Sequence, residues 1–124
     1  MSGKHKKSTL EKAQSKAWKY YKSWRISGSV CPAFHGERIF VSRLGWNHLV
    51  SPRKKRTAKE KIRRFEALPL ARKLIECSTT YQEHREDHGI SFWALSAHMD
   101  GRKIKVILSS KNKKKYFLSV IVLK

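Results

Sequence analysis

Residues 100–109 read DGRKIKVILS, and this stretch decides the fold. The Asp-Gly pair at its start is a strong signal for a tight turn between two antiparallel strands. After the turn, Ile104, Val106 and Leu108 alternate with a second set of residues that contains two lysines, which is the period of a strand with one buried face. The stretch therefore predicts a β-hairpin whose second strand is residues 102–109.

The pattern continues on both sides of this hairpin. Residues 79–85 and 90–98 predict two preceding strands, and residues 116–123, YFLSVIVL, predict a strongly apolar last strand. Strict alternation divides the last strand into two faces, with Phe117, Ser119 and Ile121 on one and Leu118, Val120 and Val122 on the other. Because both faces carry apolar residues, this strand is expected inside the sheet and covered at least in part on both sides.

The first half of the chain predicts helices. Ser8 with Glu11, and Thr57 with Glu60, have capping-box spacing ahead of apolar residues at helical intervals. The first of these helices carries an apolar stripe made of Leu10, Ala13, Ala17, Trp18, Tyr21 and Trp24. Pro69 favours a third helix over residues 69–77. Residues 38–43 look extended, and Gly45 is expected to break that segment. Helices followed by an antiparallel meander define an α+β domain.

The charge of the chain points to a polyanionic partner. There are 29 Lys and Arg against 9 Asp and Glu, a net charge of +20 over 124 residues. Each cation that neutralises a phosphate releases condensed counterions, so nucleic acid is the expected partner. We expect a disordered basic tail over residues 1–7 and one domain over residues 8–124. The two cysteines could pair, but the absence of CxxC spacing favours a reduced protein. No apolar run is long enough to span a membrane, so we expect a location in the cytoplasm, either of the producing cell or of a target cell.

The sequence offers no set of metal or cofactor ligands. His84 and His88 are four residues apart, but they fall in a predicted strand and loop, and no Cys or carboxylate pattern completes a zinc site. There is no Gly-rich phosphate loop, and the acidic residues do not pair as ligands of a two-metal nuclease. We therefore expect no metal and no cofactor.

The remaining residues suit RNA cleavage without a metal. RNA carries its own nucleophile, the 2′-hydroxyl, so a protein needs only a base, an acid and cations. His48 and His84 are candidates for proton transfer, and Lys105 for stabilising charge on the phosphate. Ser119, alone among apolar residues, either bonds to backbone or binds a phosphate oxygen. The candidate RNA-binding residues are Arg53, Lys54, Lys55, Arg56, Arg85 and Lys103.

The order of these segments resembles the phage and mobile-element branch of the barnase–EndoU–colicin–RelE-like (BECR) ribonucleases. The matching motifs within residues 38–123 are IFVS at 39–42, WNHL at 46–49, LP at 68–69 with ARKLIE at 71–76, and KYFLSV at 115–120. The resemblance implies helices packed on a curved four-stranded antiparallel sheet. It also implies a toxin-like, metal-free endoribonuclease that leaves a 2′,3′-cyclic phosphate and a 5′-hydroxyl, with a cognate antitoxin or immunity protein as a further partner.

The resemblance also implies roles for single residues. His48 matches the family's histidine after the first strand, and Ser119 matches its hydroxyl residue in the last strand. Many members carry a second histidine shortly after the first, where this chain has Arg53 and its basic neighbours. Either Arg53 replaces that histidine or His84 supplies the second proton-transfer group, and no strand carboxylate stands out as the base. Ser119 is expected to share a sheet face with Lys103 and Lys105, with His48 reaching in.

Two other classes compete with a nuclease. A non-catalytic RNA-binding protein of ribosomal or accessory type would carry the same charge and exposed aromatic residues. It would not need an imidazole beside the basic cluster. A DNA-binding module is the third reading, but neither a recognition helix nor a zinc-finger pattern supports it.

Overall fold

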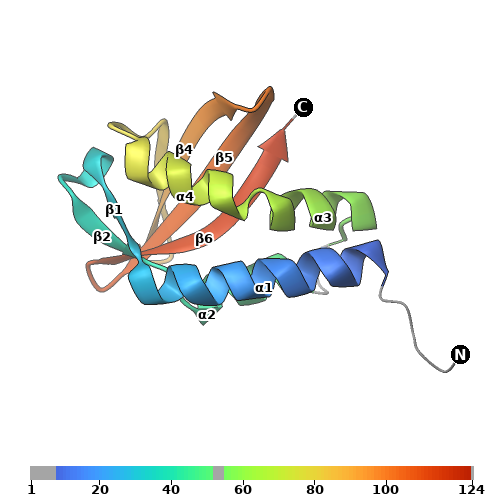
Figure 1. Ribbon diagram of the computed structural model, residues 1–124. Helices are drawn as coiled ribbons and strands as arrows, with labels where there is room; N and C mark the ends of the chain where they lie inside the picture. The colour runs from blue at the N-terminus through green and yellow to red at the C-terminus, as the bar shows by residue number, and fades with distance from the viewer. Residues whose placement is uncertain (1–7, 52–54, 124) are drawn as a thin grey trace, which may run out of the picture.

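A computed structural model describes residues 8–51 and 55–123. Its elements in chain order are α1 (Thr9–Ser27), β1 (Ser29–Cys31), the 3-10 helix η1 (Pro32–Phe34), β2 (Glu37–Phe40), α2 (Arg43–Val50), α3 (Ala58–Glu66), α4 (Leu68–Cys77), β3 (Glu83–Asp87), β4 (Ile90–Met99), β5 (Arg102–Lys111) and β6 (Lys114–Leu123). The strands form one sheet in the order β1-β2-β6-β5-β4-β3, and α1 runs alongside α3 and α4 on one side of it (Figure 1). The predicted α+β class is confirmed.

Helix α1 begins and packs as its sequence predicts. The Ser8 hydroxyl accepts from the Glu11 amide at 3.1 Å, and the Glu11 carboxylate accepts from the Ser8 amide at 3.0 Å, which completes the capping box. Ala17, Tyr21 and Trp24 on the predicted stripe are buried. The helix ends at Gly28, whose φ of 64° favours glycine.

The segment around Gly45 is helix α2, so the prediction that Gly45 interrupts the secondary structure is wrong. The Ser42 hydroxyl caps the helix by accepting from the Leu44 amide at 3.3 Å. Gly45 lies inside α2 where the helix meets β6, and a Cβ there would stand 2.7 Å from the carbonyl oxygen of Phe117. A glycine is thus required by close packing at this point. Sequence alone does not distinguish such a glycine from one that ends an element.

The sheet has two strands more than the four-stranded sheet that the sequence predicts. Strands β3 to β6 are the predicted antiparallel meander, with the Asp100–Gly101 turn between β4 and β5. Strand β2 adds to β6 in parallel, with Ile39 opposite Lys115, and β1 pairs antiparallel with β2. With only three residues between Gly28 and Pro32, β1 is too short to show a periodic pattern.

A β-bulge in β6 overturns the strict alternation expected along it. Ile107 lies opposite Ser119 and Leu108 lies opposite Phe117, so Leu118 is an extra residue without its own partner on β5. The bulge turns Phe117 to the helix side of the sheet, while Ser119 points to the other side. Phe117 and Ser119 are therefore on opposite faces, and the prediction that they share one is wrong. β6 does lie inside the sheet, between β2 and β5, as predicted.

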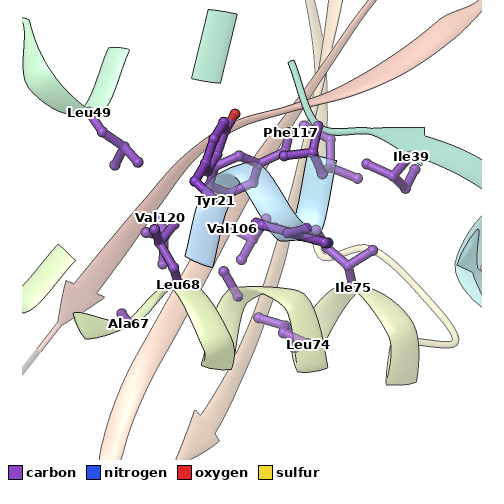
Figure 2. Close-up of a cluster of buried hydrophobic side chains, with 14 of the residues drawn as sticks. Tyr21, Ile39, Leu49, Ala67, Leu68, Leu74, Ile75, Val106, Phe117 and Val120 are labelled. Atoms are coloured by element: carbon purple, nitrogen blue, oxygen red, sulfur yellow. The ribbon is translucent and has the colours of Figure 1, made fainter. Parts of the chain in front are cut away.

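The core fills the space between the helices and one sheet face. Figure 2 shows Tyr21 of α1 beside Phe117, with side chains of α4, β2 and β5 around them. Burial raises the pKa of Tyr21 well above its usual range, and its hydroxyl donates to the Ser42 carbonyl. Cys31, buried, and Cys77, exposed, are free thiols. Across residues 8–51 and 55–123, we find no helix with the length and apolar character needed to cross a membrane.

Candidate functional site

A groove of about 970 Å³ lies on the sheet face turned away from α1 and α4. Its walls come from α2, residues 55–56, α3 and strands β3 to β6. Its polar and charged lining consists of His48, Lys55, Arg56, Glu60, Arg64, Gln82, Glu83, His84, Arg85, Lys105 and Ser119. Cations outnumber carboxylates in this lining, so the groove is suited to an anionic ligand.

The register of β5 and β6 brings Ser119 and Lys105 to this face. Ser119 lies opposite Ile107, and Lys105 lies opposite Ile121, so these side chains point to the same side of the sheet. Lys103, two residues earlier on β5, shares that side but is exposed and lies outside the groove. The predicted sharing of one face by Lys103, Lys105 and Ser119 is confirmed, and His48 lines the same groove.

Arg64 of α3 closes the side of the groove next to β6. Strand β2 pairs only with the start of β6, so within the described chain the second half of β6 has no strand partner on this side. Arg64 donates to the Val120 carbonyl at 3.3 Å and to the Ser119 hydroxyl at 3.4 Å. It thereby satisfies one acceptor on the open strand edge. No sequence pattern singled out Arg64, although its spacing of four from Glu60 was a signal that both lie on one helix face.

Arg64 and Arg56 form a partly buried pair of cations. The Arg64 side chain is only 14% exposed, and its partner Glu60 is 3.8 Å away. Burial lowers the pKa of Arg64, the nearby Arg56 charge lowers it further, and Glu60 opposes both effects. Burial also lowers the pKa of Arg56. Two neighbouring guanidinium groups that share one carboxylate gain stabilisation from an added anion, and their planar forks match phosphate oxygens.

Arg56 also connects the groove to α2. Its guanidinium donates to the carbonyls of His48 at 3.4 Å and Leu49 at 3.3 Å. These are carbonyls of the last turn of α2, which have no partner within the helix. The contact fixes the end of α2 that carries His48, so the imidazole-bearing turn and the arginine pair are held together.

Glu83 of β3 provides a strand carboxylate that the sequence did not reveal. Its carboxylate lies 2.8 Å from the ammonium of Lys105 across the groove floor. The hydrogen bond and charge of Lys105 hold the pKa of Glu83 below its usual range. The signal in the sequence was the alternation of charged residues around His84 in a predicted strand, which places Glu83 and Arg85 on one face.

His84 points away from these groups. It lies opposite Trp93, which lies opposite Leu108 of the core, so its ring is on the helix side of the sheet. The imidazole stacks on Trp93 at 4.9 Å between ring centroids, with 7° between the planes. His84 borders the groove, but its imidazole does not share a face with Lys105 and Ser119. The structure thus places His84 at the border of the groove, on the other sheet face from Lys105 and Ser119.

The predicted RNA-binding residues divide into three groups. Lys55, Arg56 and Arg85 line the groove, and the Arg85 guanidinium lies 4.8 Å from the centre of the Phe92 ring. Lys103 is beside the groove. Arg53 and Lys54 lie outside the described residues.

The pKa of Glu83 provides a direct check on the groove. Replacing Lys105 with methionine is expected to raise this pKa toward the usual glutamate range, because the closest cation and hydrogen-bond donor is removed. In the unchanged protein the carboxylate stays ionised as the pH falls below that usual range. Titration followed by NMR of the side-chain carboxyl carbon measures both values. Lys103→Met is the matched control and should give a smaller rise, and equal rises would contradict the contact.

In the part of the chain that the structure describes, no three His, Cys, Asp or Glu side chains gather as metal ligands. Comparison of the chain with models of protein families, with curated proteins and with solved structures finds no match.

Proposed function

We propose that this protein is a metal-independent endoribonuclease of the BECR type, which cleaves RNA to a 2′,3′-cyclic phosphate and a 5′-hydroxyl. One observation supports the proposal most. The groove combines an imidazole, a carboxylate and a set of cations on one face: His48, Glu83, Arg56, Arg64 and Lys105. The resemblance to this family adds that the enzyme is a toxin with a cognate antitoxin or immunity protein.

These groups suffice for attack by the 2′-hydroxyl on the adjacent phosphorus. The ionised Glu83 accepts the proton of the hydroxyl, and His48 donates a proton to the leaving 5′-oxygen. Negative charge develops on the phosphate oxygens as the new bond forms. The Arg56–Arg64 pair and Lys105 stabilise that charge, as fixed cations in a groove do most effectively. Glu83 thus takes the role that the sequence had assigned to His84.

A non-catalytic RNA-binding protein is the second candidate, supported by the net charge of +20. The two carboxylates in the groove argue against it. Glu60 and Glu83 repel phosphate and weaken binding, so a surface selected only for RNA affinity gains nothing from them. A general base, by contrast, has to be a group of this kind.

The test is RNA cleavage by the purified protein in excess EDTA. We expect total RNA to be degraded and the products to carry 2′,3′-cyclic phosphates, which block ligation to a 5′-phosphate until the phosphate is removed and a 3′-hydroxyl is exposed. The same oligonucleotide with 2′-O-methyl groups should bind and remain intact, because its nucleophile is blocked. If unmodified RNA binds but stays intact under all buffer conditions, the protein is a binding protein and the proposed chemistry is wrong.

A further inference from the structure

Four aromatic rings form a cluster on the helix side of β3 and β4: Phe34, Tyr81, His84 and Trp93. Phe34 stacks on Tyr81 with centroids 5.6 Å apart and 8° between the planes. His84 stacks on Trp93, and Phe34 meets Trp93 edge-on at 5.4 Å. Tyr81 and His84 are 6.1 Å apart. We call these four residues the aromatic cluster.

The outer rings of the aromatic cluster are exposed, while the inner rings are anchored. Tyr81 is 41% exposed, and every residue of the edge strand β3, His84 included, is exposed. Phe34 and Trp93 pack against the core. The Lys115 ammonium lies 4.8 Å from the Phe34 ring and 4.9 Å from the Trp93 ring, and Glu37 holds it at 2.9 Å. The exposed rings therefore rest on inner rings that the core and the Lys115–Glu37 ion pair hold in place, which lowers the entropic cost of binding a flat ligand.

The aromatic cluster borders the groove at the edge strand, where His84 and Trp93 belong to the lining of both. Successive side chains of β3 alternate, so Glu83 and Arg85 face the groove while His84, between them, belongs to the cluster. A flexible polymer that leaves the groove across β3 meets Tyr81 and His84 next. A rigid duplex cannot bend around this edge.

We propose that the aromatic cluster is a second RNA subsite, where Tyr81 and His84 stack against an unpaired nucleobase. The proposal rests on the function proposed for the groove and adds that the substrate is a single strand longer than the groove. The net charge of +20 favours a phosphate polymer over an apolar protein segment. Stacking on aromatic rings is how proteins hold single strands without reading a specific base.

The test compares two lengths of 2′-O-methyl RNA, which cannot be cleaved. Single strands of about 4 and about 12 nucleotides lie within the usual range of single-strand site sizes, the first at its lower end. We expect Tyr81→Ala to lower affinity for the longer RNA by about 5- to 150-fold, the equivalent of one stacked base. Affinity for the shorter RNA, which fills the groove alone, should be unchanged. Tyr81→Phe, which keeps the ring, should bind both RNAs like the unchanged protein.

Each outcome separates the subsite from the groove. Binding of both RNAs by Tyr81→Ala at full affinity overturns the subsite and leaves the proposed function intact. Failure of the unchanged protein to bind either RNA overturns both. If Tyr81→Ala does not fold, photo-crosslinking of the unchanged protein to 5-iodouridine RNA decides the question. Crosslinks at Tyr81 or His84 support the subsite, and crosslinks confined to groove residues overturn it.

Discussion

Replacing His48 with alanine is expected to lower the rate of RNA cleavage by about 10²–10⁴-fold, the usual effect of removing one proton-transfer group. The fold should survive, because His48 is only partly buried and Arg56 bonds to its backbone carbonyl, which alanine retains. RNA affinity should change little, since the cations of the groove remain. Single-turnover kinetics on a labelled oligonucleotide, with a thermal melt and a binding curve for the same sample, measure the three quantities separately.

Two further variants serve as comparisons for His48→Ala. Asn47→Ala alters the adjacent, exposed position of α2 and should keep full activity. Glu83→Gln keeps the shape of the side chain but removes the charge that accepts the proton, and its rate should fall by a similar factor to that of His48→Ala. Full activity in His48→Ala would refute the proposed mechanism. A parallel loss of rate and affinity would instead identify His48 as a binding residue.

Replacing Gly45 with valine is expected to destabilise the protein by about 3 kcal/mol, at the upper end of the cost of overpacking. A Cβ at this position would lie 2.6 Å from the Tyr21 hydroxyl oxygen, 2.7 Å from the Phe117 carbonyl oxygen and 2.9 Å from the Phe117 ring. The carbonyl belongs to a central strand and cannot move aside. In a protein of 124 residues we expect a fall in the melting temperature of roughly 10 °C or more.

The sign of this effect is informative, because helix propensity alone predicts the opposite. An exposed glycine within a helix costs about 1 kcal/mol relative to alanine. Asn47→Ala in the same helix tests that propensity without a clash and should leave stability unchanged or slightly higher. Gly45→Ala should be destabilising despite its better propensity. A melting temperature of Gly45→Ala at or above that of the unchanged protein would show that α2 can move away from β6.

Local signals in the sequence were sufficient to predict the helix starts and the turn that are fixed by neighbouring residues. Three such elements depend on residues only a few positions apart: the capping box at Ser8, the N-cap at Thr57 and the Asp100–Gly101 turn. At the second of these, the Thr57 hydroxyl accepts from the Glu60 amide at 3.1 Å. The same alternation that defined β5 also placed Lys105 in the groove.

Features that depend on long-range contacts could not be predicted from the sequence. Helix α2 contains a glycine that only its contact with β6 explains, and β2 pairs in parallel with a strand that follows it by more than seventy residues. Arg64 gains its position from the open edge of β6, and Glu83 from a bond to Lys105 on β5. The position of the His84 ring on the helix side could not be predicted, because strand parity shows which residues share a face but not which face meets the helices.

The extra residue in β6 divides this strand into two segments whose registers on β5 differ by one residue. Before Leu118, Phe117 lies opposite Leu108, and this register points the Phe117 side chain into the core. After Leu118, Ser119 lies opposite Ile107, and this register points the Ser119 side chain into the groove. Deleting Leu118 would straighten the strand and keep both partners. Deleting Val120 instead would let the strand realign without the bulge and set the Ser119 hydroxyl opposite Val106, inside the apolar layer. A one-residue deletion at Leu118 therefore keeps Phe117 in the core and Ser119 in the groove, whereas a deletion at Val120 does not.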